Sequence, residues 1–317
     1  MPDILITGAN GFVGSALSAK MLADGWKVRG AVQSAKCVKN LPIGLKIRLI
    51  DSIDASTDWS DALNGIDVII HLAARVHLMK DTAGDPLASY RHVNVAGTER
   101  LARTAIACGV KRIIYVSSVK VNGPVSESPY TELDDPAPQK PYDISKWEAE
   151  QILKKISIET GLEVVVIRSP LIFGPGVKAN FLRLMKLVDK NIPLPLGSIK
   201  NKRSLIYVGN LVDAIIACVS HTEAAGETFL VSDGRDISTP DLINIIAKEL
   251  GKRPFILCCP SWLIRNLGRL IGRGEDIGRL TDSLMVDSSK IRKMLGWTPP
   301  YTLEEGIRET VKWYRSL

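Results

Sequence analysis

The sequence predicts an α/β fold in which a doubly wound, parallel sheet carries a smaller, interleaved C-terminal lobe. Over the first 170 residues, strand-like apolar runs alternate with helical patterns, which is typical of a parallel sheet with helices on both faces. A glycine-rich turn at Gly8, Gly11 and Gly14 follows the first strand. The 317 residues exceed the roughly 100–200 of one domain, so a second lobe is expected.

The elements of the first half follow from the length and hydrophobic pattern of each run. Strands are predicted at 3–7, 27–32, 45–50, 67–72, 112–117 and 163–168. Helices are predicted at 12–22, 59–63, 86–108 and 141–160. Ligands of such sheets gather at the carboxyl ends of the strands, so functional residues are expected there.

After about residue 170 the pattern loosens, because prolines and glycines interrupt it between Pro170 and Gly176. Helices are predicted at 210–219, 239–250, 260–272, 288–295 and 303–315. We expect residues 1–170 to form the first domain and residues 171–317 to form mainly the second lobe, with part of 204–235 returning to the first domain.

Composition excludes several classes of protein. Hydrophobic residues make up 45% and charged residues 24%, which is ordinary for a globular chain. The net charge of +7 suits a phosphorylated small molecule, whereas the scattered lysines and arginines, not interleaved with aromatic residues, argue against nucleic acid. The segment 262–273 mixes apolar residues with arginines and predicts a packed lid helix or, at most, peripheral membrane contact.

The protein is expected to be cytoplasmic. No apolar run approaches the roughly 18–20 residues that span a bilayer, and the chain enters a strand pattern at once, without a signal sequence. The five cysteines are odd in number and show no C-x-x-C spacing, which favours reduced thiols and argues against a metal site. The four histidines lack a partner pattern for acid/base work, so His71 is expected to pack at the sheet edge.

The glycine turn Thr7-Gly-Ala-Asn-Gly-Phe-Val-Gly14 is the first candidate site. Glycines at a strand-to-helix turn let backbone N–H groups approach a pyrophosphate closely, although an ordinary tight turn has the same pattern. The second strand ends in Val32-Gln33-Ser34 without the carboxylate that commonly holds an adenosine 2′-hydroxyl, and Lys36 and Lys39 follow. This favours NADP over NAD, although the lysines could equally be solvated.

Tyr142 and Lys146 form the second candidate site, downstream of Ser117 and Ser118. On a helix the two residues share a face, so the ammonium can lie near the phenol. A neighbouring cation favours the phenolate, and we expect the pKa of Tyr142 to fall from about 10 toward neutrality. Tyr142 would then exchange a proton in an alcohol/ketone interconversion.

Five motifs together resemble the extended short-chain dehydrogenase/reductase family, particularly its nucleotide-sugar epimerases, dehydratases and reductases. They are Thr7-Gly-x-x-Gly-x-x-Gly14, His71-Leu-Ala-Ala74, Asn94-Val-x-Gly-Thr98, Ser117-Ser118 and Tyr142-x-x-x-Lys146. The resemblance implies a Rossmann-like NAD(P)-binding domain and a substrate lobe for a UDP-sugar. It makes Ser118, Tyr142 and Lys146 catalytic, assigns Asn94 to bracing the central helix, and implies a homodimer formed through two helices per subunit.

The resemblance also implies the residues around both ligands. The cofactor would contact Gly8, Asn10, Gly11, Phe12, Val13, Gly14, Gln33, Lys36, Asp51, Ser52, Ile53, Leu72, Ala73, Ala74, Arg75, Asn94, Ser117, Tyr142, Lys146, Ser169 and Leu171. The UDP-sugar would contact Ser118, Val119, Lys120, Asn180, Leu194, Leu196, Arg203 and either Arg273 or Arg279, with 193–197 extended beside the base. The chain departs from the family pattern at two places. Many relatives have Gly-Asp followed by a hydrophobic residue in contact with adenine, where this chain reads Ile50-Asp51-Ser52-Ile53, and Asn122 occupies a position that is often aromatic.

Two reactions share this apparatus. A 4-ketoreductase would reduce a UDP-2-acetamido-2,6-dideoxy-4-ketohexose to UDP-N-acetylquinovosamine or a stereoisomer for surface polysaccharide (O-antigen or capsule) synthesis, and a UDP-hexose 4-epimerase would oxidise C4 and return the hydride to the other face. The missing second-strand acid favours the reductase, because it suggests an exchangeable NADP. Val119-Lys120 after Ser118 disfavours a dehydratase. A non-catalytic NADP-binding sensor would be expected to lack Tyr142 or Lys146.

Overall fold

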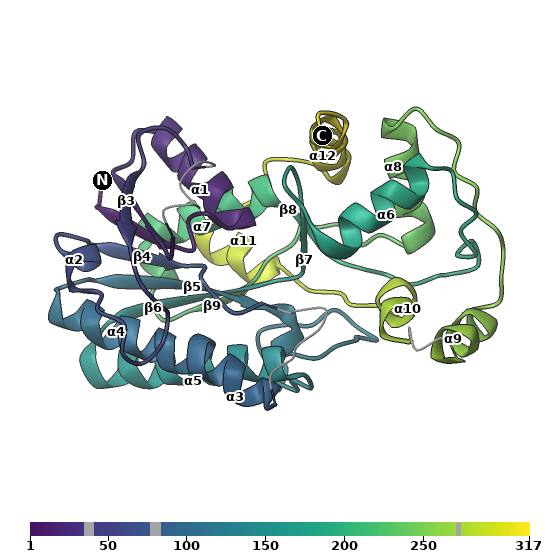
Figure 1. Cartoon of the computed structure of the whole chain (residues 1–317). Coiled ribbons are helices and arrows are strands. Elements are labelled where there is room, and N and C mark those ends of the chain that lie inside the picture. The colour runs from purple at the N-terminus through teal and green to yellow at the C-terminus, as the bar shows by residue number, and fades with distance from the viewer. Residues whose placement is uncertain (35–40, 77–83, 271–273) are drawn as a thin grey trace.

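The computed structural model describes residues 1–34, 41–76, 84–270 and 274–317, and its sheet has the predicted class (Figure 1). Seven parallel strands pair in the order β3-β2-β1-β4-β5-β6-β9. Their bounds are β1 Ile4–Thr7, β2 Val28–Val32, β3 Lys46–Leu49, β4 Val68–His71, β5 Arg112–Ser118, β6 Glu163–Ser169 and β9 Thr228–Leu230. The order reverses between β1 and β4, which places the expected ligand crevice at their carboxyl ends.

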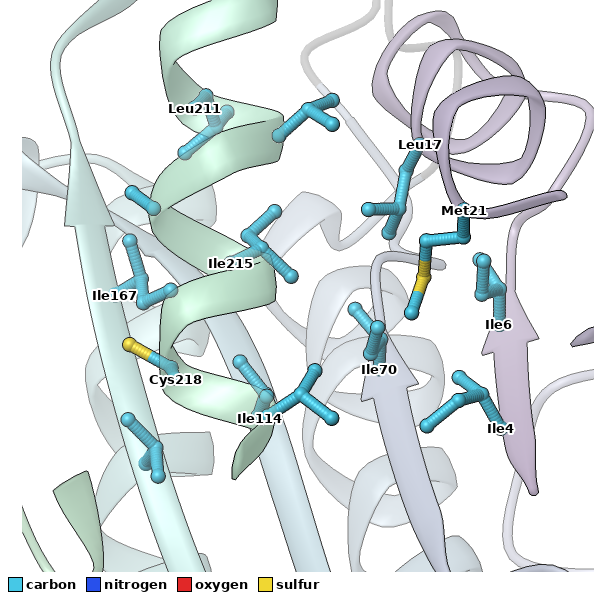
Figure 2. Close-up of a cluster of buried hydrophobic side chains, with 14 of the residues drawn as sticks. Ile4, Ile6, Leu17, Met21, Ile70, Ile114, Ile167, Leu211, Ile215 and Cys218 are labelled. Atoms are coloured by element: carbon cyan, nitrogen blue, oxygen red, sulfur yellow. The ribbon is translucent and has the colours of Figure 1, made fainter. Parts of the chain in front are cut away.

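Helices cover both faces of the sheet because successive strand residues point to opposite sides. On one face Ile4, Ile6 and Ile70 pack against α1 (Phe12–Ala23) and α7 (Val208–Ser220), as Figure 2 shows with Leu17, Met21 and Ile215. On the other face Leu5, Ile69 and Ile113 pack with α2 (Ser60–Leu63), α4 (Gly97–Ala107) and α5 (Pro141–Thr160). The sheet therefore has two apolar interfaces, with β1 and β4 at its centre.

The predicted single helix 86–108 is continuous but not uniform. It comprises α3 (Pro86–Tyr90), a π-helical segment Arg91–Ala96 and α4. π-Turns inside α-helices are frequent at functional sites, because they redirect side chains within an otherwise regular helix. Here the segment contains Asn94, which is buried and turned toward α5.

The second lobe is built from β7 (Leu171–Phe173) paired in parallel with β8 (Leu205–Tyr207), and from helices around them. The helices are α6 (Ala179–Asp189), α8 (Thr239–Glu249), α9 (Ser261–Leu270), α10 (Gly274–Thr281) and α12 (Leu303–Arg315). Phe173, Phe181, Ile243 and Ile307 lie in their shared core.

Between the two lobes the chain crosses more than once. After β8 it enters α7, which packs on the seven-stranded sheet, and then β9, which is the last strand of that sheet. α11 (Ser289–Leu295) packs on the same face of the sheet as α7. Across the described residues, none of the helices combines the length and apolar character needed to cross a membrane.

Candidate active site

The glycines at positions 8 and 14 of the turn leave no room for a side chain. Gly8 has φ of +66°, and a Cβ there would lie 3.0 Å from the backbone of Ala73; a Cβ on Gly14 would lie 2.2 Å from the carbonyl oxygen of Gly8. The positive φ and both close approaches require glycine. The backbone between β1 and α1 therefore lies bare at the carboxyl edge of the sheet, which fits a dinucleotide diphosphate.

The side chain of His71, the last residue of β4, connects the end of β1 to α4 through hydrogen bonds. Its Nδ1 lies 2.6 Å from Thr7 Oγ1 and its Nε2 lies 3.0 Å from Thr98 Oγ1. Thr7 Oγ1 already accepts from the amides of Leu72 and Ala73, so its proton goes to His71 Nδ1 and the ring proton sits on Nε2. Burial, together with the charge of Lys146, lowers the pKa of His71 to about 3, so the ring is neutral. Sequence reasoning missed this role.

Ser118, Tyr142 and Lys146 lie where the end of β5 meets the first turns of α5. Ser118 closes β5, and its Oγ accepts from the amide of Lys120 at 3.2 Å. The ammonium of Lys146 donates to the carbonyl of Val116, two residues before Ser118, at 2.7 Å. This hydrogen bond holds the start of α5, which carries Tyr142 and Lys146, against the strand that ends at Ser118. The three predicted catalytic residues thus lie toward the same edge of the sheet.

The protonation states differ from the sequence-based expectation at Tyr142. Burial, then the nearby Asp143 and Tyr90, raise the pKa of Tyr142 well above its usual value. The expected fall toward neutrality is therefore wrong for the chain by itself, because desolvation of the phenol outweighs the lysine one turn away. Burial lowers the pKa of Lys146 to about 7, against the opposing effect of Glu150.

Asn94 connects the cofactor side to the helix that carries Tyr142. Its Oδ1 accepts from the amide of Arg75 at 2.7 Å, and its Nδ2 donates to Ser145 Oγ at 3.0 Å. Ser145 Oγ in turn donates to the carbonyl of Tyr142 at 2.7 Å. A single buried amide thereby ties the segment after β4 to the first turn of α5.

A buried ion pair that the sequence analysis did not identify lies under the same edge. Arg168 Nη2 is 2.6 Å from Glu150 Oε2, and both side chains are about 5% exposed or less. Glu150 also accepts from the hydroxyl of Ser117, and Arg168 donates to Asn122 Oδ1 at 3.1 Å. The pair joins β5, β6, α5 and the loop after Ser118, so Asn122 serves this network. The i+4 spacing from Lys146 to Glu150 would have suggested a different pair, because Glu150 binds Arg168 of β6 instead.

Cations gather across from these groups. The charges of Arg203, Arg279 and Lys140 all act on Lys120, and the charge of Arg279 also acts on Arg203. Burial lowers the pKa of both Lys120 and Arg203. Arg203 donates to the carbonyl of Asp282 at 3.0 Å, which orients its guanidinium. Of the two alternatives for a second arginine, Arg279 lies in this cluster, and Arg273 falls outside the described residues.

The remaining predicted contacts are distributed unevenly. Gln33 and Asp51 are exposed at the ends of β2 and β3, Ile53 is buried beneath Gly97, and Leu171 is exposed on β7. Lys36 lies outside the described residues. Asn180 lies half-buried in the first turn of α6.

The predicted extended edge at 193–197 is wrong. Only Leu194 forms a β-bridge, with Ile256, and residues 195–198 turn. Leu194 and Leu196 are 7% and 5% exposed in the core of the second lobe. The family resemblance implied an extended segment here, but both leucines point inward because the turn lets each fill that core.

Comparisons with known proteins agree with this geometry. A model of the NAD dependent epimerase/dehydratase family matches residues 4–232. UDP-glucose 4-epimerase of Vibrio cholerae is 45% identical over 314 residues, which cover 98% of this chain and 94% of that protein. The structure of MoeE5 in complex with UDP-glucuronic acid and NAD matches with a TM-score of 0.79 at 26% identity, covering 99% of this chain and all of that one. UDP-glucose 4-epimerase of Thermotoga maritima with UDP-glucose shares the fold, with a TM-score of 0.79 at 23% identity and 99% of both chains covered.

Proposed function

Because the chain belongs to the NAD-dependent epimerase/dehydratase family, we propose that it is an NAD-dependent 4-epimerase of a UDP-linked hexose. The Vibrio cholerae relative, aligned over nearly the whole of both chains, supports the epimerase more than the 4-ketoreductase that the sequence alone favoured. The observation that carries the proposal is the hydrogen bond that holds Lys146, one helical turn after Tyr142, against β5 two residues before Ser118, at the sheet edge that also bears the glycine turn.

In this proposal the chain's own groups handle one proton and position two ligands. As a phenolate, which the ammonium of Lys146 and the positive charge of bound NAD would favour, Tyr142 Oη would take the proton from the C4 hydroxyl and later return it, while Ser118 Oγ would hydrogen-bond the same oxygen. NAD, when bound, supplies a hydride acceptor and a positively charged ring. Lys146 would hold the ribose next to that ring, and the glycine turn would hold the diphosphate.

The charges in the second lobe suit a nucleoside diphosphate. Arg203 has a planar guanidinium that can bind two phosphate oxygens at once, and Arg279 and Lys120 add positive charge beside it. A UDP-sugar bound between these cations and the end of β5 would place its diphosphate at the cations and its hexose near Ser118.

We propose NAD as the cofactor. MoeE5, at 26% identity, was solved with NAD, and the comparisons give no support to the preference for NADP. One feature still favours the 4-ketoreductase as a second candidate. Gln33 follows β2 where a carboxylate commonly binds the adenosine ribose, so the cofactor could exchange during turnover.

A homodimer through the outer face of α4 and α5 remains part of the proposal. That face has an open groove formed by the π-helical segment and α5, with Val95, Ala96, Trp147 and Ile152 among its apolar lining. Light scattering after size-exclusion chromatography tests it, and a monomer at micromolar concentration would contradict it.

The decisive experiment compares two substrates. We expect the purified enzyme to convert UDP-glucose to UDP-galactose without added reductant, and to retain NAD that mass spectrometry identifies after denaturation. Stoichiometric consumption of NAD(P)H with a UDP-4-ketosugar, and no epimerisation of UDP-hexoses, would instead establish the reductase. The Tyr142→Phe variant serves as the control for both assays.

A further inference from the structure

Lys146 is a buried cation whose carboxylate neighbour is already occupied. Its side chain is 3% exposed, and no carboxylate of the described residues forms an ion pair with it. Glu150, one turn along α5, accepts from both Arg168 and Ser117 instead. A buried ammonium with so little direct compensation should lose its proton, because desolvation penalises the charged form.

The ring of Tyr115 lies directly against this ammonium. Lys146 Nζ is 4.2 Å from the centre of the ring, well within the distance at which a cation is attracted to an aromatic face. Tyr115 is 1% exposed, and its hydroxyl has no hydrogen-bond partner among the residues that the structure describes. The face of the ring, and not its polar end, is therefore the part that meets the lysine.

The ring and one backbone carbonyl contact Nζ from two sides. The carbonyl of Val116 takes one N–H at 2.7 Å, and the Tyr115 ring covers another side. On the neighbouring strand, directly opposite Tyr115, the ring of the neutral His71 lies 5.6 Å from that of Tyr115 and restrains it. The ammonium keeps further N–H groups that could donate to a ligand.

We propose that Tyr115 is a positioning residue for the reaction, whose aromatic face keeps Lys146 protonated and aims its ammonium at the cofactor ribose. The role in catalysis rests on the proposed function, but the effect on the lysine does not. The contact replaces the carboxylate that a buried lysine would ordinarily require. Sequence reasoning had treated Tyr115 only as part of a strand.

Other charged or titratable groups surround Lys146. Glu150 and Tyr142 share α5, His71 faces it from β4, and Arg168 on β6 neutralises Glu150. Tyr90 on α3 packs edge-on against the Tyr142 ring, 6.0 Å away. Each of these groups is unchanged when only Tyr115 is substituted, so a shift in the lysine titration reports on the ring.

The test measures the protonation of Lys146 itself. In protein labelled with ¹³C at lysine Cε, the Lys146 resonance is assigned by its loss in Lys146→Arg and titrated by NMR. We expect Tyr115→Leu to lower the pKa of Lys146 by about one unit, and Tyr115→Phe, which keeps the face and removes only the unpartnered hydroxyl, to leave it unchanged. In the holoenzyme, the alkaline limb of kcat should move to lower pH by the same amount in Tyr115→Leu alone.

A titration that is the same in all three proteins would overturn the proposal, since a purely structural ring would not move it. If Tyr115→Leu does not fold, phenylalanines fluorinated to increasing degrees at position 115 keep the shape and weaken the face stepwise. The pKa should then fall stepwise, and a flat series would refute the role. Absence of epimerase activity in the wild type would count against the proposed function, while the lysine titration would remain readable.

Discussion

The two sides of the candidate site differ in how their charges are balanced. On the sheet side, Arg168 is paired with Glu150 and His71 is neutral. Facing it, Lys120 after β5 and Arg203 and Arg279 of the second lobe cluster with Asp143, Asp276 and Asp282 as the nearby acids. Apart from Lys146, whose ammonium forms no ion pair with a carboxylate of the described residues, the groups of the sheet side balance one another, which suits a fixed geometry. The other side brings several cations together, which suits a dianionic diphosphate.

The largest expected effect is on the sheet side. Tyr142→Phe removes the proton donor and acceptor but keeps the ring, so kcat should fall by at least about 10²-fold. Bound NAD, measured by absorbance and mass, should stay near the wild-type amount. Turnover close to that of the wild type would refute the proton-transfer role.

Breaking the buried ion pair between Arg168 and Glu150 should lower the free energy of unfolding more than it lowers the rate of the reaction. Glu150→Ala leaves Arg168 buried without its counter-charge, and we expect a loss of about 3–5 kcal/mol in the free energy of unfolding. Urea denaturation followed by circular dichroism measures it. Glu150→Gln, which keeps the size and one hydrogen bond, is the matched comparison and should lose less. Equal losses in both variants would mean that the charge contributes little.

The second lobe should respond in binding. Arg203→Met removes a charged donor to the diphosphate while preserving much of the side chain's length, so KM for the UDP-sugar should rise by about 10- to 100-fold. The value of kcat should change little, because the guanidinium would be as strongly bound before as during the reaction. A fall in kcat at unchanged KM would place Arg203 in the chemistry instead.

The smallest effect concerns His71 and pH. Its pKa is about 3 when folded and about 6.5 when unfolded, so the unfolded chain binds more protons between these values. Its contribution to stability is present above about pH 6.5 and falls by about 1.4 kcal/mol for each pH unit below it. Unfolding curves at pH 7.5, 6 and 5 should therefore converge for the wild type and His71→Gln. Parallel curves would contradict the neutral, buried ring.

The family and most of the first domain were predictable because their signals are local. The motifs around Gly8, Ser118 and Tyr142 predicted the family that the comparisons confirm. Pro141 at the first position and Gly161 just after the last, with φ of +76°, mark the ends of α5, and its bounds agree with the prediction.

The missed elements depend on tertiary contacts. β7, β8 and β9 have three residues each, too few for a pattern to emerge, and exist because a neighbouring strand pairs with them. α6 and α10 lie near glycines that suggested loops. The protonation state of Tyr142 and the contact between Tyr115 and Lys146 depend on burial, which no spacing of residues records.

The position of β9 has a consequence for how the polypeptide emerges from the ribosome. β6 pairs with β9 through residues 166–168 and 228–230, so its outer edge stays open until about sixty more residues have been made. Most of that stretch belongs to the other lobe. Nascent chains arrested shortly before residue 228 should therefore recruit chaperones or aggregate, whereas chains released after α7 and β9 have cleared the exit tunnel should not.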